Sequence, residues 1–154
     1  MTRIETQVHV ALSPRRLFAY FIPQRIGYWY GPNTQTEFEV SDGAAEFAVA
    51  QKVRISGRIG RRQVSHTAVV TECRWGETLE WRFEDRSGLR GTERWDFEPV
   101  EIGGTPGTLL RMRSDYEFTG FVARAVNWIL TRHAVARRNR DFLKRLKRLA
   151  EPDK

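Results

Sequence analysis

Apolar and polar residues alternate at the start of the chain and again through most of its middle. Residues 4–10 read Ile-Glu-Thr-Gln-Val-His-Val, the period of two that is typical of a half-buried strand. The same period recurs between residues 34 and 118 in segments separated by turn residues. We place these strands at 34–40, 45–57, 61–73, 77–85, 90–99 and 107–118. Their connections are too short for crossover helices, which predicts antiparallel pairing.

Three helices are predicted around these strands. Ser13 can cap the first, with Pro14 at its first helical position. Pro23 opens a second short helix, which residues 31–32 (Gly-Pro) close. Residues 119–150 form a long helix, because apolar residues recur there at spacings of three and four.

The long helix carries two apolar faces. The face of its first half contains Val122, Ala125, Val126, Ile129, His133 and Ala136, and that of its second half Val135, Phe142, Leu143, Leu146 and Leu149. In a straight helix the two sets are displaced by about 100° around the axis. We therefore expect its two ends to pack on different neighbours.

The strands have one apolar and one charged face. Side chains assigned inward by alternation are Phe47, Val49, Gln51, Val53, Ile55, Leu79, Trp81, Phe83, Trp95, Phe97, Leu110, Met112, Ser114, Tyr116 and Phe118. The opposite face carries Lys52, Arg54, Glu80, Arg82, Glu84, Arg94 and Asp96, which we expect to form exposed cross-strand pairs. This pattern predicts an α+β fold with a sheet covered on one side.

Composition excludes several classes of protein. The chain has 154 residues, enough for one domain, 1–154, with its own core. A lone cysteine, Cys73, cannot form an internal disulfide, and His9, His66 and His133 lack metal-ligand spacing. We therefore expect neither a metal nor another cofactor. Residues 121–130 are too short to span a bilayer, and no targeting segment is recognisable, so the expected location is cytoplasmic.

Basic residues concentrate in the long helix. The chain has a formal charge of +7, and residues 132–148 contain eight basic residues against one acid, Asp141. This run is either a solvated helix face or a docking surface for an anionic membrane or a protein partner. Sedimentation with liposomes at low and high salt distinguishes the two. Nucleic acid is a less favoured partner, because the aromatic residues sit at buried positions and are not interleaved with the basic ones.

The order of elements resembles a known superfamily. Four segments carry the likeness. The first is residues 4–21, and the second runs from 66–72 (His-Thr-Ala-Val-Val-Thr-Glu) through Gly76 to Leu-Glu-Trp at 79–81. The third is residues 92–99, which end in Trp-Asp-Phe-Glu-Pro, and the fourth is residues 143–149. Over essentially the whole chain this order resembles the START-like (SRPBCC) superfamily, which includes polyketide cyclases/dehydrases, plant pollen-allergen proteins and lipid-transfer domains. The resemblance implies a helix-grip fold, in which a curved seven-stranded antiparallel sheet wraps a long C-terminal helix around a cavity for a hydrophobic molecule.

Residues at inward positions are the candidate ligand contacts. They are Trp29, Phe47, Val49, Gln51, Val53, Trp81, Phe83, Trp95, Met112, Tyr116, Phe121, Ala125, Ile129 and His133. Aromatic walls with few polar groups suit apolar or planar ligands. Alternatively, the same rings simply fill the core. We interpret Gln51 as an orienting hydrogen-bond donor, and His133 either as a contact for an anionic ligand group at the cavity mouth or as a structural histidine.

Glu93, His66 and Tyr116 are weak catalytic candidates. A carboxylate or imidazole facing an apolar cavity can act as a general acid or base. No spacing places a partner beside either Glu93 or His66, so catalysis is the less favoured interpretation.

The leading hypothesis is therefore binding, or transport, of a hydrophobic small molecule such as a lipid, an aromatic polyketide-like compound or a quinone. The alternatives are a cyclase or dehydratase that uses the acid and base candidates, and a carrier that docks through its basic helix.

Overall fold

A computed structural model describes residues 2–31, 36–59, 62–84, 89–118 and 121–151. Within these ranges the side chains of 58, 59, 62–64, 118 and 121–131 lie outside the description. Phe121, Ala125 and Ile129, which the sequence marked as ligand contacts, fall in this last group.

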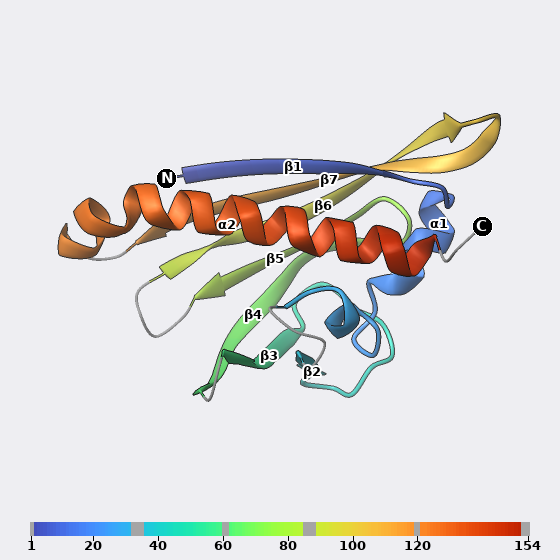
Figure 1. The fold of residues 1–154 in the computed structure, drawn as a ribbon. Helices are drawn as coiled ribbons and strands as arrows, with labels where there is room; N and C mark the ends of the chain where they lie inside the picture. The colour runs from blue at the N-terminus through green and yellow to red at the C-terminus, as the bar shows by residue number, and fades with distance from the viewer. Residues whose placement is uncertain (1, 32–35, 60–61, 85–88, 119–120, 152–154) are drawn as a thin grey trace.

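Seven antiparallel strands form one sheet in the order β1-β7-β6-β5-β4-β3-β2 (Figure 1). The strands are β1 (Thr2–Val10), β2 (Glu37–Val40), β3 (Lys52–Ile59), β4 (Arg62–Arg74), β5 (Thr78–Glu84), β6 (Leu89–Ile102) and β7 (Thr105–Phe118). After β2 each strand pairs with the next along the chain, and β1 closes the far edge beside β7. The predicted antiparallel sheet is confirmed.

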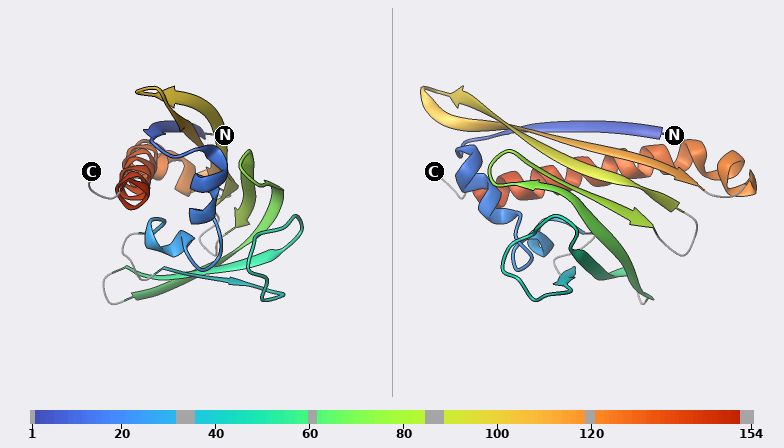
Figure 2. Two further views of the ribbon diagram at one scale, coloured as in Figure 1. Left: turned by 90° about the vertical axis from the view of Figure 1, so that its right-hand side faces the viewer. Right: turned by 180° about the vertical axis from the view of Figure 1, so that it is seen from behind.

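The sheet curves around the long helix α2 (Phe121–Ala150), as the end-on view in Figure 2 shows. A bulge between Val70 and Glu72 shifts the register of β4 against β5, and bulges increase the local twist of a sheet. Gly91 allows β6 and β7 to approach closely, since a Cβ atom there would lie 2.0 Å from the Asp115 carbonyl oxygen. The α2 helix runs beside β1 across the concave face. These features give the helix-grip architecture.

In residues 11–31 and 36, the described part of the segment between β1 and β2, the helical elements are short turns. They are α1 (Pro14–Leu17) and the 3-10 turns η1 (Phe18–Tyr20) and η2 (Ile26–Tyr28). Pro14 begins α1 as expected, but the Ser13 side chain makes no capping hydrogen bond within the described part of the chain; the Ser13 carbonyl instead accepts from the Leu17 N–H at 2.9 Å. The second predicted helix is only the single turn η2.

Residues 45–51 are not a strand, contrary to the sequence prediction. Ala50 has a φ of 72°, in the left-handed region that interrupts an extended chain. The Gln51 side chain holds this loop, because its amide nitrogen donates to Asp42 and to the Glu46 carbonyl, and its amide oxygen accepts from the Ala48 N–H. Val49 is consequently 59% exposed, so its inward placement was wrong. Gln51 thus orients this loop, and it is not among the described lining residues of the pocket beside α2; its contact with a ligand stays a prediction.

Aromatic rings fill the concave side of the sheet. Trp29, Trp81 and Trp95 are fully buried, and the rings of Trp81 and Trp95 lie 4.7 Å apart at an angle of 66°. Phe142 and Leu146 of α2 complete this core near the C-terminal end of the helix. The prediction that these side chains point inward is thus confirmed for most of the predicted positions on β3, β5, β6 and β7.

The convex face carries the expected charged pairs. Arg94 on β6 bonds Glu80 on the neighbouring strand β5 at 3.2 Å, Glu72 on β4 at 2.6 Å, and Asp96 on its own strand at 3.0 Å. Because such pairs lie near solvent, each contributes roughly 0.2–1 kcal/mol to stability. This side of the sheet needs no covering layer.

Candidate ligand-binding site

A pocket of about 140 Å³ lies between the concave face of the sheet and α2. Its described lining comes from β4 to β7, from α2 and from the segment after η2. The lining residues are Tyr30, His66, Phe83, Leu89, Glu93, Ser114, Tyr116, Val135 and Arg138. The pocket therefore combines rings and aliphatic side chains with a small number of polar groups.

The Glu93 carboxylate is the centre of the polar wall. This side chain on β6 is only 2% exposed. Its Oε2 atom accepts a hydrogen bond from the Tyr30 hydroxyl at 2.7 Å, and its Oε1 atom accepts from Nη2 of Arg138 at 2.6 Å. Each carboxylate oxygen thus has a donor, which a buried charge requires.

A chain of hydrogen bonds continues from this ion pair to β7. Nε and Nη2 of Arg138 donate to the side-chain oxygen of Asn139 at 3.2 and 3.1 Å. The Asn139 amide nitrogen donates to the Ser114 hydroxyl at 2.9 Å, and Asn139 is fully buried. The network therefore ties α2 to two strands at the level of the pocket.

Two aromatic rings flank the Arg138 guanidinium. Its carbon lies 5.1 Å from the centre of the Phe142 ring and 5.8 Å from that of Tyr30, within the range of cation–π attraction. The Arg138 side chain is 37% exposed. It thus spans the distance from the buried carboxylate to solvent.

The surroundings keep the two tyrosines protonated. Burial, and then the Glu93 charge, raise the pKa of Tyr30 well above its usual value. Burial also raises the pKa of Tyr116, although Arg132 and Arg138 oppose the shift. Burial alone would lower the pKa of Arg138, but the Glu93 charge, together with Tyr30 and the hydrogen bonds to both, outweighs it and the net shift is upward. At neutral pH the wall therefore offers phenol hydroxyls and a guanidinium.

Four of the residues singled out from the sequence meet at this pocket. They are Phe83 and Tyr116 among the ligand candidates, and Glu93 and His66 among the acid and base candidates. Tyr30, from the segment after η2, joins them. Their contact with a ligand stays a prediction.

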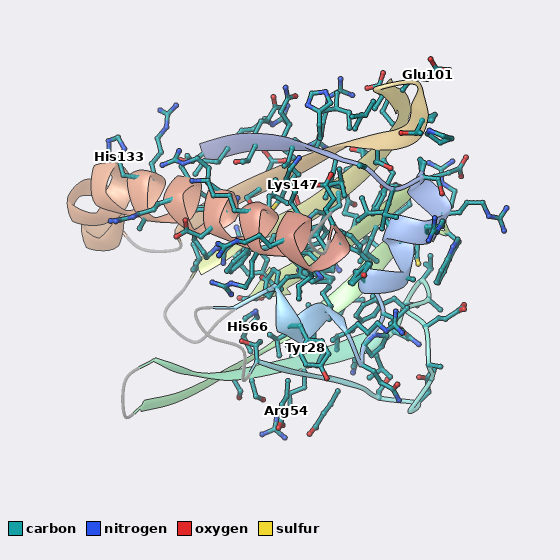
Figure 3. All side chains as sticks on the ribbon, turned by 45° about the vertical axis from the view of Figure 1, so that its right-hand side comes forward. Tyr28, Arg54, His66, Glu101, His133 and Lys147 are labelled. Carbon is teal, nitrogen blue, oxygen red and sulfur yellow. The ribbon has the colours of Figure 1, made fainter. Side chains whose placement is uncertain are left out.

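Other sequence candidates lie elsewhere. Six are buried in the core and are not among the described lining residues: Trp29, Phe47, Val53, Trp81, Trp95 and Met112. His133 is exposed and projects away from β3 and β4 (Figure 3), so its placement at the cavity mouth was wrong. Its position on α2 turns it to solvent, while the inward face of this part of the helix belongs to Val135 and Asn139.

Sequence reasoning missed Arg138 and Asn139. Arg138 was counted in the basic run of the helix, and no role was assigned to Asn139. The sequence did contain a signal for them. In the second half of the helix, the apolar face has Val135 and then Phe142, seven residues later, with no apolar residue at the intermediate position three or four residues after Val135. Residues 138–139 occupy that position, and polar residues at an inward helical position indicate a buried polar contact.

A second, open hollow of about 910 Å³ borders the pocket. Much of its lining is polar, from Arg54, Thr67, Arg82, Glu84 and Thr92 of the convex face, and Figure 3 shows Arg54 pointing away from α2. Among the described residues, His66 and Phe83 line both this hollow and the inner pocket. Their ring centres are 6.2 Å apart. The pocket and the open hollow therefore meet at these two rings.

The basic run of α2 is divided between internal contacts and solvent. Arg145 donates to the Trp29 and Gly31 carbonyls and Lys147 to the His9 carbonyl, while Arg138 bonds Glu93. The basic residues left exposed on α2 are Arg132, Arg137, Arg140, Lys144 and Arg148. Docking of a membrane or protein partner on them stays a prediction. None of the helices in the described ranges is both long and apolar enough to cross a membrane.

Solved structures resemble this chain over nearly its whole length. A protein of Mesorhizobium loti matches with a TM-score of 0.71 at 18% identity, covering 99% of this chain and 100% of the other. A protein of Thermus thermophilus gives 0.70 at 16% identity, with 99% and 100% covered. Ara h 8.0201 gives 0.71 at 9% identity, with 99% of each chain covered. At these identities the likeness shows the fold, which is the predicted helix-grip fold of START-like proteins.

The search of curated proteins finds no match. Residues 1–151 match the model of a family described as polyketide cyclase/dehydrase and lipid transport. That match spans all seven strands and the long helix that enclose the pocket. The chain is a member of this polyketide cyclase/dehydrase and lipid-transport family.

Proposed function

We propose that the protein binds a small hydrophobic molecule in the pocket between the concave sheet and α2. The observation that carries the proposal is the composition of the wall, where apolar side chains such as Phe83 and Val135 surround a compact polar cluster of Glu93, Arg138 and Tyr30. Binding sites for small molecules combine a mostly apolar lining with a few placed polar groups. The family description and the fold support the same function.

The volume of the pocket limits the size of its ligand. An apolar protein cavity of roughly 150 Å³ accommodates one benzene molecule, and this pocket measures about 140 Å³. Pockets for drug-sized molecules span roughly 300–1,000 Å³. The proposed ligand is therefore a single aromatic ring or a group of that size. A lipid or a multi-ring polyketide exceeds the pocket unless side chains move.

Entry to the pocket is proposed to occur past His66 and Phe83. These rings belong to both the inner pocket and the open hollow. A ligand that crosses between the two must displace one of them. Side-chain rotation at such a position requires no change in the paired strands β4 and β5 that carry the two rings.

Filling the pocket is expected to abolish binding. Val135→Phe adds a ring to a lining residue of α2, so the affinity for fluorobenzene should fall tenfold or more. The measurement is the concentration-dependent broadening and shift of the ¹⁹F NMR signal of fluorobenzene.

Ala134→Phe is the matched control, because it adds the same ring at an exposed position next to Val135. This variant should bind like the wild type. Absence of saturable broadening with the wild-type protein, or equal binding by Val135→Phe, contradicts the proposal.

Proton-transfer catalysis is a second candidate function. One observation favours it, since His66, Glu93 and Tyr116 come from three strands and line the same pocket. General acid–base groups contribute roughly 10²- to 10⁴-fold to a rate. For a cyclase or dehydratase acting on a polyketide-like substrate, Glu93→Gln and His66→Ala should each lower turnover by at least 100-fold. Unchanged turnover in both variants removes this candidate.

A further inference from the structure

The charges around the pocket indicate which class of small molecule it would bind. This inference rests on the proposed function. Arg138 and Glu93 carry opposite charges and lie 2.6 Å apart. The two tyrosine hydroxyls beside them are held protonated, since the pKa of each is raised. The polar cluster formed by Glu93, Arg138 and Tyr30 therefore presents hydrogen-bonding groups with no net charge.

We propose that the pocket selects neutral single-ring aromatic molecules that carry one hydrogen-bonding oxygen, and that the Glu93–Arg138 pair excludes their carboxylate analogues. Arg138 attracts an incoming anion less than an unpaired guanidinium would, because Glu93 already compensates its charge. An added carboxylate would also lie close to the Glu93 carboxylate. Burial of a charge that gains no counter-charge is costly.

A neutral oxygen meets no such cost. A carbonyl or hydroxyl group can accept a hydrogen bond from the Arg138 guanidinium, whose five N–H groups exceed the three bonds it makes to Glu93 and Asn139, and it brings no charge that needs compensation. A hydrogen bond of this kind adds orientation with modest energy. The favoured class consists of aryl ketones, phenols and aryl amides, with the ring against Phe83, Leu89 and Val135.

Benzamide and benzoate form a matched pair of probes for this selection. They have nearly the same shape and differ in charge. At pH 8 and low salt, wild-type protein should bind benzamide at least tenfold more tightly than benzoate, as measured by isothermal calorimetry or ligand-detected NMR.

Glu93→Gln is expected to remove this preference. The glutamine has the shape of the glutamate and can still accept a hydrogen bond, but it leaves the Arg138 charge uncompensated. Benzoate affinity should therefore rise at least tenfold. The double variant Glu93→Gln/Arg138→Met removes both charges and should restore the preference for benzamide.

The probes separate failure of this inference from failure of the proposed function. Equal binding of benzamide and benzoate by wild-type protein overturns the inference even if Glu93→Gln does not fold. An unchanged preference in folded Glu93→Gln also overturns it. If fluorobenzene does not bind to wild-type protein, the proposed function itself fails.

Discussion

Replacing Trp95 with Ala should lower the free energy of unfolding by about 4 kcal/mol, in line with large-to-small substitutions at buried aromatic residues. Trp95 is fully buried on β6. Its ring lies 4.7 Å from that of Trp81 and 6.1 Å from those of Trp29 and Tyr30. The substitution leaves a cavity in the centre of the aromatic core and removes these ring contacts. Urea denaturation followed by circular dichroism measures the loss.

Trp75→Ala is the matched control for this experiment. Trp75 is 39% exposed, contacts the Phe18 ring at 4.9 Å and donates a hydrogen bond to the Arg15 carbonyl. Because much of this ring is already in water, its removal should cost about 1 kcal/mol. Equal destabilisation by the two substitutions would contradict the assignment of the core.

Removing one partner of the buried ion pair should produce the second large effect. Arg138→Met leaves the Glu93 carboxylate, only 2% exposed, with Tyr30 as its remaining donor in the described network. Breaking a buried pair costs roughly 3–5 kcal/mol. We expect about 2–3 kcal/mol here, because the 37% exposure of Arg138 allows solvent to screen the charge. Urea denaturation measures this change as well.

Arg137→Met provides the comparison at a neighbouring exposed arginine. It removes the same charge from the same helix and should change stability by less than about 0.5 kcal/mol. Adding Glu93→Gln to Arg138→Met should recover part of the lost stability, since the unpaired charge is then gone. If Arg138→Met is as mild as Arg137→Met, the ion pair does not have the stabilising role assigned to it.

The fold could be predicted from the sequence largely because alternation along a strand is a local property. It placed Trp81, Trp95 and Met112 inward, and all three are fully buried. It failed at residues 45–51, where apolar residues alternate by chance. There the left-handed conformation of Ala50 and the hydrogen bonds of Gln51 form a loop. Loop conformations of this kind have no period that a pattern can reveal.

Of the buried ion pair in the candidate site, the sequence predicted the position of Glu93 but not that of Arg138. Strand parity indicated that Glu93 faces inward. Its partner Arg138 lies 45 residues further along the chain, on a helix whose direction across the sheet no local pattern gives. The charge of Arg138 grouped it with its exposed neighbours, although it faces the pocket. Pairing between elements that are distant in sequence therefore required the structure.

Pocket volume also changed the expected ligand. Inward aromatic residues suggested a large cavity, yet most of these rings pack on one another. The space that remains beside α2 has the size of one ring. Aromatic composition alone does not distinguish a filled core from an empty cavity, since both need the same residues.

The most direct test of this account is the location of a bound probe. In NMR spectra of the labelled wild-type protein titrated with fluorobenzene, saturable shifts should centre on residues that line the pocket, such as Leu89, Ser114 and Val135. The exposed stripe around Arg140 and Lys144 should remain unchanged. Saturable shifts that centre elsewhere, or none at all, would contradict the claim that this pocket is the binding site.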